Sequence, residues 1–156
     1  MSMPAAGDRA PAFELADQHG ATVRLSDLVA RGPVVLFFYP KDDTSGCTKE
    51  ACRFRDDFSK FQEAGAEVAG ISSDSTESHQ KFATKYSLPF TLLSDPGRKV
   101  RKLYGAVGFF GLLPGRVTFV IDRSGVVRHV YSSQSHFERH AAEALSGVVQ
   151  NAHRVA

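Results

Sequence analysis

The chain has 156 residues, of which 42% are hydrophobic, and a formal net charge of +2. This length predicts a single domain, residues 1–156, whose core needs neither disulfides nor a metal ion. Basic and acidic residues alternate along the chain and no apolar run approaches a membrane span, so the composition argues against a nucleic-acid or membrane partner.

The first forty residues predict a hairpin, a short helix and a buried strand. Residues 1–9 lack the basic start and apolar stretch of a signal peptide, so we expect a cytoplasmic protein, with a cleaved organellar precursor as the alternative. Short strand patterns at 12–15 and 21–25 flank turn residues at 17–20, and Ser26 is expected to cap a helical turn. Residues 34–39 are continuously apolar or aromatic, which indicates a strand buried on both faces, and Pro40 ends it.

Helical and strand patterns alternate through the rest of the chain. We expect a helix from residue 44 to Gly65, then a strand at 67–72, a helix at 75–86, a strand at 90–93, a helix at 98–104 and a loop at 105–115. A hairpin at 117–121 and 126–131 and a helix at 136–149 complete the order. This order predicts an α/β protein with a thioredoxin-like fold, in which a mixed central sheet with an N-terminal β-hairpin is flanked by helices.

Both cysteines lie where the buried strand gives way to a helix. If Thr44 is the N-cap, Cys47 lies in the first helical turn, where unpaired N–H groups and the helix dipole favour a thiolate. Gly46 is expected to leave the flank of Cys47 open, whereas Cys52 is rotated toward the polar side of the helix. We therefore expect a reactive Cys47 in a pocket and a Cys52 nearer to solvent.

The spacing of the two cysteines has a geometric consequence. If the helix continues through both, their Cα atoms lie about 8.6 Å apart. A disulfide requires a Cα separation below roughly 7 Å. A bond between Cys47 and Cys52 therefore requires that the first turns of the helix unwind.

Other titratable residues suggest little chemistry. Zinc would need two further ligands and no histidine lies within the cysteine segment, so a metal site is the minor alternative. Asp42 and Asp43 resemble a solvated loop. Five of the six histidines are expected on surface elements without ligand spacing: His79, His129, His136, His140 and His153.

Residues 40–47 read Pro-Lys-Asp-Asp-Thr-Ser-Gly-Cys and match Pro-x-x-x-Thr-x-x-Cys, the signature of peroxiredoxins. With Cys52 included, the segment resembles the bacterioferritin comigratory protein, or peroxiredoxin Q, branch of that family. The similarity covers nearly the whole chain, including residues 7–13, 70–72, 90–95 and 116–122. The approach Leu113-Pro114-Gly115-Arg116 is similar to the peroxiredoxin Q form.

The resemblance implies roles for five residues. Cys47 would be the peroxidatic nucleophile that becomes a sulfenic acid, and Cys52 would resolve it as an intramolecular disulfide. Thr44 would hydrogen-bond the peroxide or the sulfur, and Pro40 would shield the pocket from water. Arg116 would donate to both thiolate and peroxide, so we expect its guanidinium within hydrogen-bond reach of the Cys47 sulfur.

The resemblance also implies the partners. The substrates would be hydrogen peroxide and organic hydroperoxides, the reductant would be thioredoxin or a similar dithiol, and no cofactor or metal is expected. The Gly-Gly-Leu-Gly loop and C-terminal Tyr-Phe helix of typical two-Cys peroxiredoxins are absent, which favours a monomer. Two other functions compete: a peroxide sensor that binds a partner when oxidised, and a general thiol-disulfide oxidoreductase, although the latter uses Cys-x-x-Cys spacing.

Overall fold

The computed structural model describes residues 3–107 and 115–154, with side chains described up to residue 150. Its seven-stranded sheet has the order β2-β1-β5-β4-β3-β6-β7. The strands are β1 (Glu14–Asp17), β2 (Thr22–Arg24), β3 (Val34–Phe38), β4 (Glu67–Ser72), β5 (Thr91–Ser94), β6 (Val117–Ile121) and β7 (Val127–Ser132). The helices are α1 (Leu25–Arg31), α2 (Ser45–Asp56), α3 (Phe58–Glu63), α4 (Thr76–Tyr86), α5 (Lys99–Leu103) and α6 (Arg139–Arg154), with a 3-10 turn at Pro96–Arg98.

The sheet is mixed, as the sequence predicts. Strands β3, β4 and β5 are parallel, β6 runs antiparallel to β3, and the β1–β2 and β6–β7 pairs are antiparallel. All five residues of β3 are buried, because β3 lies in the interior of the sheet with helices over both faces. The thioredoxin-like fold and its N-terminal hairpin are confirmed.

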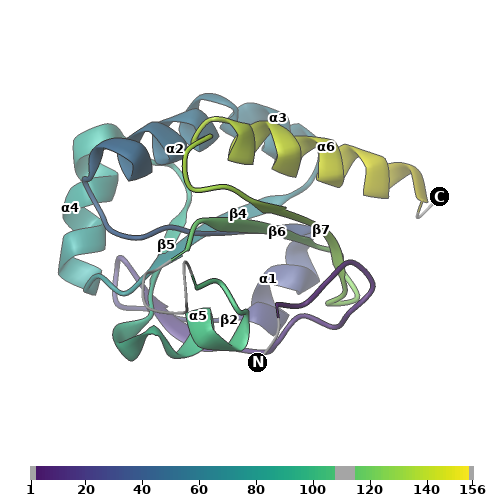
Figure 1. The fold of residues 1–156 in the computed structure, drawn as a ribbon, viewed down its shortest axis with the longest axis horizontal. Helices are drawn as coiled ribbons and strands as arrows, with labels where there is room; N and C mark the ends of the chain where they lie inside the picture. The colour runs from purple at the N-terminus through teal and green to yellow at the C-terminus, as the bar shows by residue number, and fades with distance from the viewer. Residues whose placement is uncertain (1–2, 108–114, 155–156) are drawn as a thin grey trace.

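Helices cover the sheet in two layers (Figure 1). Helices α2, α3 and α6 lie over one face with α4 at its side, and α1 and α5 lie beneath the other face. Alternate residues of β3 enter the two cores: Val35 and Phe37 join Phe54 of α2 in one, while Leu36 joins Tyr104 in the other. The period-two alternation of a strand thus divides one apolar run between two hydrophobic cores.

Several element boundaries differ from the sequence prediction. The helix expected to run to Gly65 is interrupted at Asp57, whose φ and ψ are −95° and 4° and whose carboxylate accepts from Arg53 at 2.9 Å. Aspartate competes for local hydrogen bonds in this way, which weakens it as an interior helix residue. The first helix begins at Leu25, before the expected cap at Ser26, and the last begins at Arg139.

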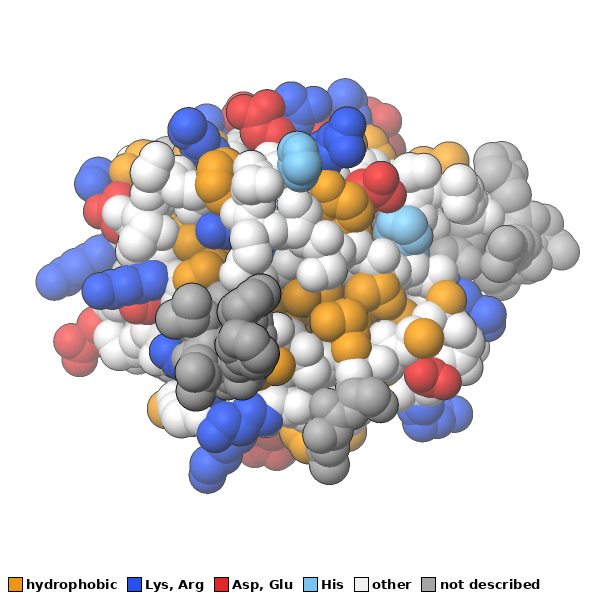
Figure 2. All heavy atoms as spheres, in the orientation of Figure 1, with side chains coloured by type: hydrophobic (Ala, Val, Ile, Leu, Met, Phe, Trp, Pro, Cys, Tyr) orange, Lys and Arg blue, Asp and Glu red, His pale blue; other side chains and the backbone are white. Residues whose placement is uncertain are grey.

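Charged side chains of both signs are interspersed over the face of the molecule drawn in Figure 2. Among the described residues, no helix combines the length and apolar character needed to cross a membrane. Part of the loop expected at 105–115, including Phe109 and Phe110, lies outside the described residues.

Candidate active site

Cys47 lies in the first turn of α2 and is buried. Thr44 is the N-cap and Ser45 the first helical residue, so Cys47 is the third residue of the helix. Its side chain is 1% exposed and packs in the core with Tyr39 and Ala51. The amides of a first helical turn have no intrahelical partner, so the sulfur lies at the positive end of the helix dipole.

Arg116 directly precedes β6, and from there its side chain reaches Cys47. Because β6 is antiparallel to β3, the pairing of Phe38 with Val117 places the start of β6 beside the end of β3. The Arg116 side chain is buried, and its Nη1 lies 3.5 Å from Cys47 Sγ. The guanidinium is therefore within hydrogen-bond reach of the sulfur, as the sequence predicts.

Two residues that the sequence analysis did not single out hold the Arg116 guanidinium. Its Nη1 donates to Glu50 Oε1 at 2.7 Å, and its Cζ lies 4.7 Å from the centre of the Phe137 ring. A Cβ on Gly46 would lie 2.6 Å from that ring, so the expectation of an open flank was wrong: Gly46 makes room for Phe137. Glu50 could have been found, because it follows Cys47 by three residues on one helical face.

Glu50 and a buried histidine continue the network behind Arg116. Burial raises the pKa of Glu50 to about 8, although the Arg116 guanidinium acts in the opposite direction. The other oxygen of Glu50, Oε2, lies 3.4 Å from His140 Nδ1. His140 Nε2 donates to the Ser133 carbonyl at 2.8 Å, and Nδ1 accepts from the Thr118 hydroxyl at 2.7 Å.

This network leaves positive charge for the sulfur. Burial lowers the pKa of His140 to about 4, so its imidazole is neutral at neutral pH. Burial acts on the pKa of Glu50 in the opposite direction: it raises this pKa and so shifts the carboxyl toward its protonated form. A protonated Glu50 still accepts a hydrogen bond from Arg116 but does not neutralise it, so the Arg116 charge remains available to a Cys47 thiolate.

A second guanidinium, that of Arg101, braces the backbone on both sides of the site. It donates hydrogen bonds to the carbonyl oxygens of Tyr39, Ala106 and Gly115. These bonds connect the residue that follows β3 with the residue that precedes Arg116. Its side chain is buried, and burial lowers the pKa of Arg101 to about 10, so it stays charged at neutral pH. No spacing in the sequence connects residue 101 with this site.

Pro40 and Thr44 border the site from the loop between β3 and α2. Pro40 is half-buried and lies two residues after Phe38, the last residue of β3. Thr44 is exposed, and its hydroxyl donates to the Lys41 carbonyl at 3.0 Å. In this structure the Thr44 hydroxyl thus bonds within the loop, and its bond to a peroxide stays a prediction.

Cys52 is separated from Cys47 by an unbroken helix. Both cysteines are free, and α2 runs continuously from Ser45 to Asp56. Cys52 is half-buried, and burial raises the pKa of its thiol. The helix geometry that separates the two Cα atoms by about 8.6 Å is thus present, and a bond between the cysteines requires unwinding.

Three predictions about titratable side chains were wrong. Asp42 was expected in a solvated loop but is 7% exposed, and His79 and His140 were expected at the surface but are fully buried. Each buried group is hydrogen-bonded, which is the condition for a polar side chain in a core. His136 is exposed as expected, whereas His129 is half-buried with Glu143 as its partner at 2.9 Å.

Comparisons with known proteins agree with this geometry. Residues 6–130 match the AhpC/TSA family. Over 140 residues the chain is 56% identical to the chloroplastic peroxiredoxin Q of Sedum lineare and 55% identical to that of Oryza sativa subsp. japonica, each alignment covering 89% of this chain. The chain spans 75% of the Sedum protein's length and 64% of the rice protein's.

Solved structures give the same grouping. Peroxidoxin BcpB from Mycobacterium tuberculosis is 44% identical with a TM-score of 0.88, and the match covers 96% of this chain and 98% of that one. The bacterioferritin comigratory protein of Xanthomonas campestris, described with an alkyl peroxide reduction activity, is 28% identical with a TM-score of 0.84, covering 95% and 99% of the two chains.

Proposed function

The chain belongs to the AhpC/TSA family and is a thiol-dependent peroxidase, and on this premise we propose that it reduces hydrogen peroxide and organic hydroperoxides through Cys47. The observation that carries the proposal is the 3.5 Å contact between Arg116 Nη1 and Cys47 Sγ at the start of α2. A guanidinium and a helix N-terminus together stabilise a thiolate, the form of cysteine that attacks peroxides.

In the first step, the Cys47 thiolate attacks the terminal oxygen of the hydroperoxide and the O–O bond breaks. Cys47 becomes a sulfenic acid, and the leaving alkoxide takes up a proton to become an alcohol, or water when the substrate is hydrogen peroxide. Arg116 stabilises the charge that moves from sulfur to the leaving oxygen. In this proposal the Thr44 hydroxyl turns from the Lys41 carbonyl to the bound peroxide, and Pro40 excludes water.

In the second step, the Cys52 thiol attacks the sulfenic sulfur of Cys47, a disulfide forms and water leaves. The first turns of α2 unwind to allow this. Thioredoxin or a similar dithiol then exchanges with the disulfide, becoming oxidised while both cysteines return to thiols. The half-buried position of Cys52, nearer to solvent than Cys47, supports these unequal roles.

Matched serine variants test the mechanism. With thioredoxin and its reductase present, Cys47→Ser should abolish peroxide consumption. Cys52→Ser should consume one equivalent of peroxide and then stall unless a small thiol is added, and mass spectrometry of the oxidised parent should show a Cys47–Cys52 bond within one chain. A Cys47→Ser protein that still turns over would overturn the mechanism.

The same assay separates the competing functions. Sustained consumption by the parent protein supports a peroxidase. A single stoichiometric burst followed by lasting oxidation and a new partner complex would indicate a sensor, and disulfide reduction without peroxide would indicate a general oxidoreductase. Each alternative gives a readout that the proposed peroxidase does not.

We further propose that the protein acts as a monomer, which size-exclusion chromatography of reduced and oxidised protein would test. The compartment is proposed from the relatives and from the chemistry. The plant relatives are named chloroplastic, and the recycling step requires a compartment with a thioredoxin-type reductant, which both a plastid and the expected cytoplasm provide. Localisation of the tagged full-length protein distinguishes the two.

A further inference from the structure

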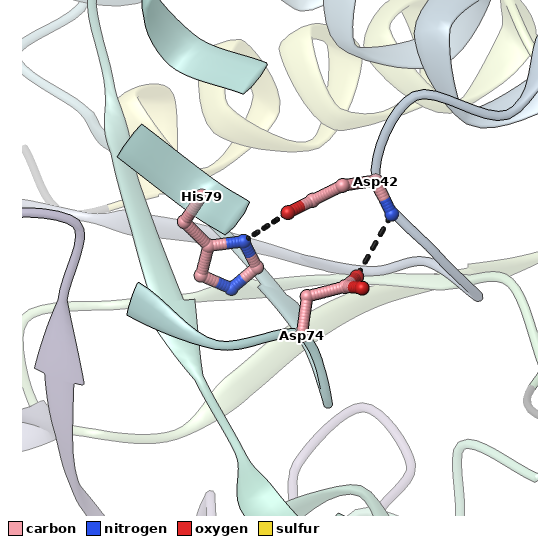
Figure 3. A group of neighbouring side chains, drawn as sticks. All are labelled: Asp42, Asp74 and His79. Carbon is pink, nitrogen blue, oxygen red and sulfur yellow. Dashed lines mark hydrogen bonds and ion pairs between the residues drawn. The ribbon is translucent and has the colours of Figure 1, made fainter. Parts of the chain in front are cut away.

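A buried polar cluster holds the loop that leads into α2. The Asp42 carboxylate accepts from the Tyr39 hydroxyl at 2.6 Å and from the Ser78 hydroxyl at 2.8 Å, and it contacts His79 Nδ1 at 2.7 Å. The Asp42 backbone N–H donates to Asp74 Oδ2 at 2.8 Å, as Figure 3 shows. The loop is thereby fastened to the start of α4 and to the end of β4.

The hydrogen bonds of His79 place a proton in its contact with Asp42. Nε2 lies 2.9 Å from the Leu93 carbonyl oxygen, which can only accept, so Nε2 carries a hydrogen. Nδ1 faces the Asp42 carboxylate at 2.7 Å, and two bare acceptors at that distance would repel, so a proton lies between them. The side chains of the pair are 0% and 4% exposed, so this short hydrogen bond is shielded from competing water.

The cluster does not have the features of a metal site. Ligand atoms of Asp42, Asp74 and His79 lie within 4.8 Å of one another, which is compatible with a cation by distance. Each is already engaged in hydrogen bonds within the protein, however: Asp74 Oδ2 accepts from the Ser72 hydroxyl at 2.6 Å as well as from the Asp42 N–H. A cation would have to displace these bonds, so the cluster is better explained by what it fastens.

The fastened residue lies close to the nucleophile in sequence. Asp42 precedes Cys47 by five residues, and α2 begins at Ser45. When the first turns of α2 unwind, the released segment stays tied at Asp42, and a tied segment gains less conformational entropy than a free one. The buried pair therefore favours the helical form of the Cys47 turn without touching the sulfur.

We propose that Asp42 and His79 are positioning residues that act as a clamp on the loop before α2 and thereby set how often Cys47 leaves its pocket to meet Cys52. The inference rests on the proposed function, because it assigns a control point to the resolving step. The clamp holds the form that reacts with peroxide, and loosening it favours the form that makes the disulfide.

Two reactions of the Cys47 sulfenic acid compete and report on this balance. In the unwound form, the Cys52 thiol displaces water and a disulfide forms. In the helical form, a second hydroperoxide gives up an oxygen to the sulfenic acid, which becomes a sulfinic acid while the hydroperoxide becomes an alcohol. A loosened clamp should therefore raise the ratio of disulfide to sulfinic acid.

The experiment compares two clamp variants with a control variant that removes a different contact of the same loop. His79→Gln removes the proton-sharing partner, and Tyr39→Phe removes a single hydroxyl donor while preserving the ring, which keeps the test valid if His79→Gln fails to fold. The control is Lys85→Met. It removes the exposed 2.8 Å ion pair between Lys85 and Asp43, the loop residue that follows Asp42. Exposed pairs of this kind contribute little, so the control should match the parent.

Each reduced protein is given a series of hydrogen peroxide concentrations, and disulfide and sulfinic acid are quantified by mass spectrometry. We expect His79→Gln to raise the disulfide-to-sulfinic ratio by roughly tenfold, and Tyr39→Phe by less, given the usual strength of a buried hydrogen bond. An unchanged ratio in folded clamp variants overturns the proposal, even if their melting temperatures fall. If the parent forms neither product, the proposed function itself has failed, so the two failures are distinguishable.

Discussion

Arg116 carries one positive charge that two acidic groups, Cys47 and Glu50, are placed to share. Arg116 Nη1 contacts both of them, at 3.5 Å and 2.7 Å. Burial favours the protonated form of Glu50, so the carboxyl orients the guanidinium by a hydrogen bond while its charge is left for the sulfur. An ionised carboxylate at the same place would instead compete with the thiolate for that charge.

This protonation predicts a pH-dependent stability that belongs to Glu50. Its pKa is raised from 4.5 to about 8 in the folded protein, so the folded state holds a proton that the unfolded state releases over that range, and stability falls as pH rises. Glu50→Gln removes this dependence. In urea unfolding of reduced protein from pH 5 to 8, the stability of Glu50→Gln relative to the parent should rise by up to about 1.4 kcal/mol per pH unit.

A relative stability that stays constant from pH 5 to 8 would contradict this, because it would mean that Glu50 is ionised throughout in the folded protein. His140 does not confound the comparison. Its pKa is lowered to about 4, so it destabilises both proteins equally as pH falls below 6.5.

At the residue scale, sequence reasoning found the residues whose chemistry is visible in a motif and missed those that act through tertiary contacts. Cys47 and Arg116 were expected to meet, and they do. The burial of Glu50 and His140 could not be read from the sequence, because charged and histidine side chains are buried only where distant partners satisfy them. Those partners include Arg116, which directly precedes β6, and Thr118 within β6.

At the scale of elements, the packing of α2 against the segment before α6 depends on the missing side chain of Gly46. A Cβ there would lie 2.6 Å from the Phe137 ring, and that ring lies over Arg116. Gly46→Ala should therefore lower the free energy of unfolding by about 1–3 kcal/mol, the usual cost of overpacking, although alanine is the better helix former.

A double-mutant cycle isolates this contact. In a Phe137→Ala background the clash is gone, so Gly46→Ala should become neutral or stabilise the protein by a few tenths of a kcal/mol or more, following helix propensity. Urea denaturation of the four proteins gives the coupling energy. Equal effects of Gly46→Ala in both backgrounds would show that the Phe137 ring does not constrain this helix start.

Element types were easier to predict than the interruptions within them. The alternation of strand and helix patterns, and the bounds of β4 at Glu67–Ser72, followed from apolar periodicity. The break at Asp57 did not, since Phe54, Phe58 and Phe61 keep a helical spacing across it. Only the contacts of Asp57 with Arg53 and Lys60 show where the backbone leaves the helix.

At the scale of the whole molecule, the sheet interior has little spare room. Gly70, in β4 between β3 and β5, has the Phe37 ring 2.7 Å and Leu92 Cδ2 3.1 Å from the place a Cβ would take. Gly70→Ala should destabilise the protein by about 1–3 kcal/mol through overpacking. At about 2–4 °C per kcal/mol for a chain of this size, thermal unfolding should show a clear drop in melting temperature.

The matched control is Thr22→Ala in the edge strand β2, where the side chain is exposed. Its effect should stay within about 0.5 kcal/mol. If Gly70→Ala and Thr22→Ala melt at the same temperature, the interior of the sheet tolerates an added methyl group and the packing argument fails.

The antiparallel pairing of β3 with β6 also orders events during protein synthesis. Cys47 and Arg116 are 69 residues apart in the chain, and they meet only after β6 has added to β3. A ribosome therefore makes Cys47 before it makes Arg116. The nascent thiol lacks the Arg116 contact until β6 has been translated and has paired with β3.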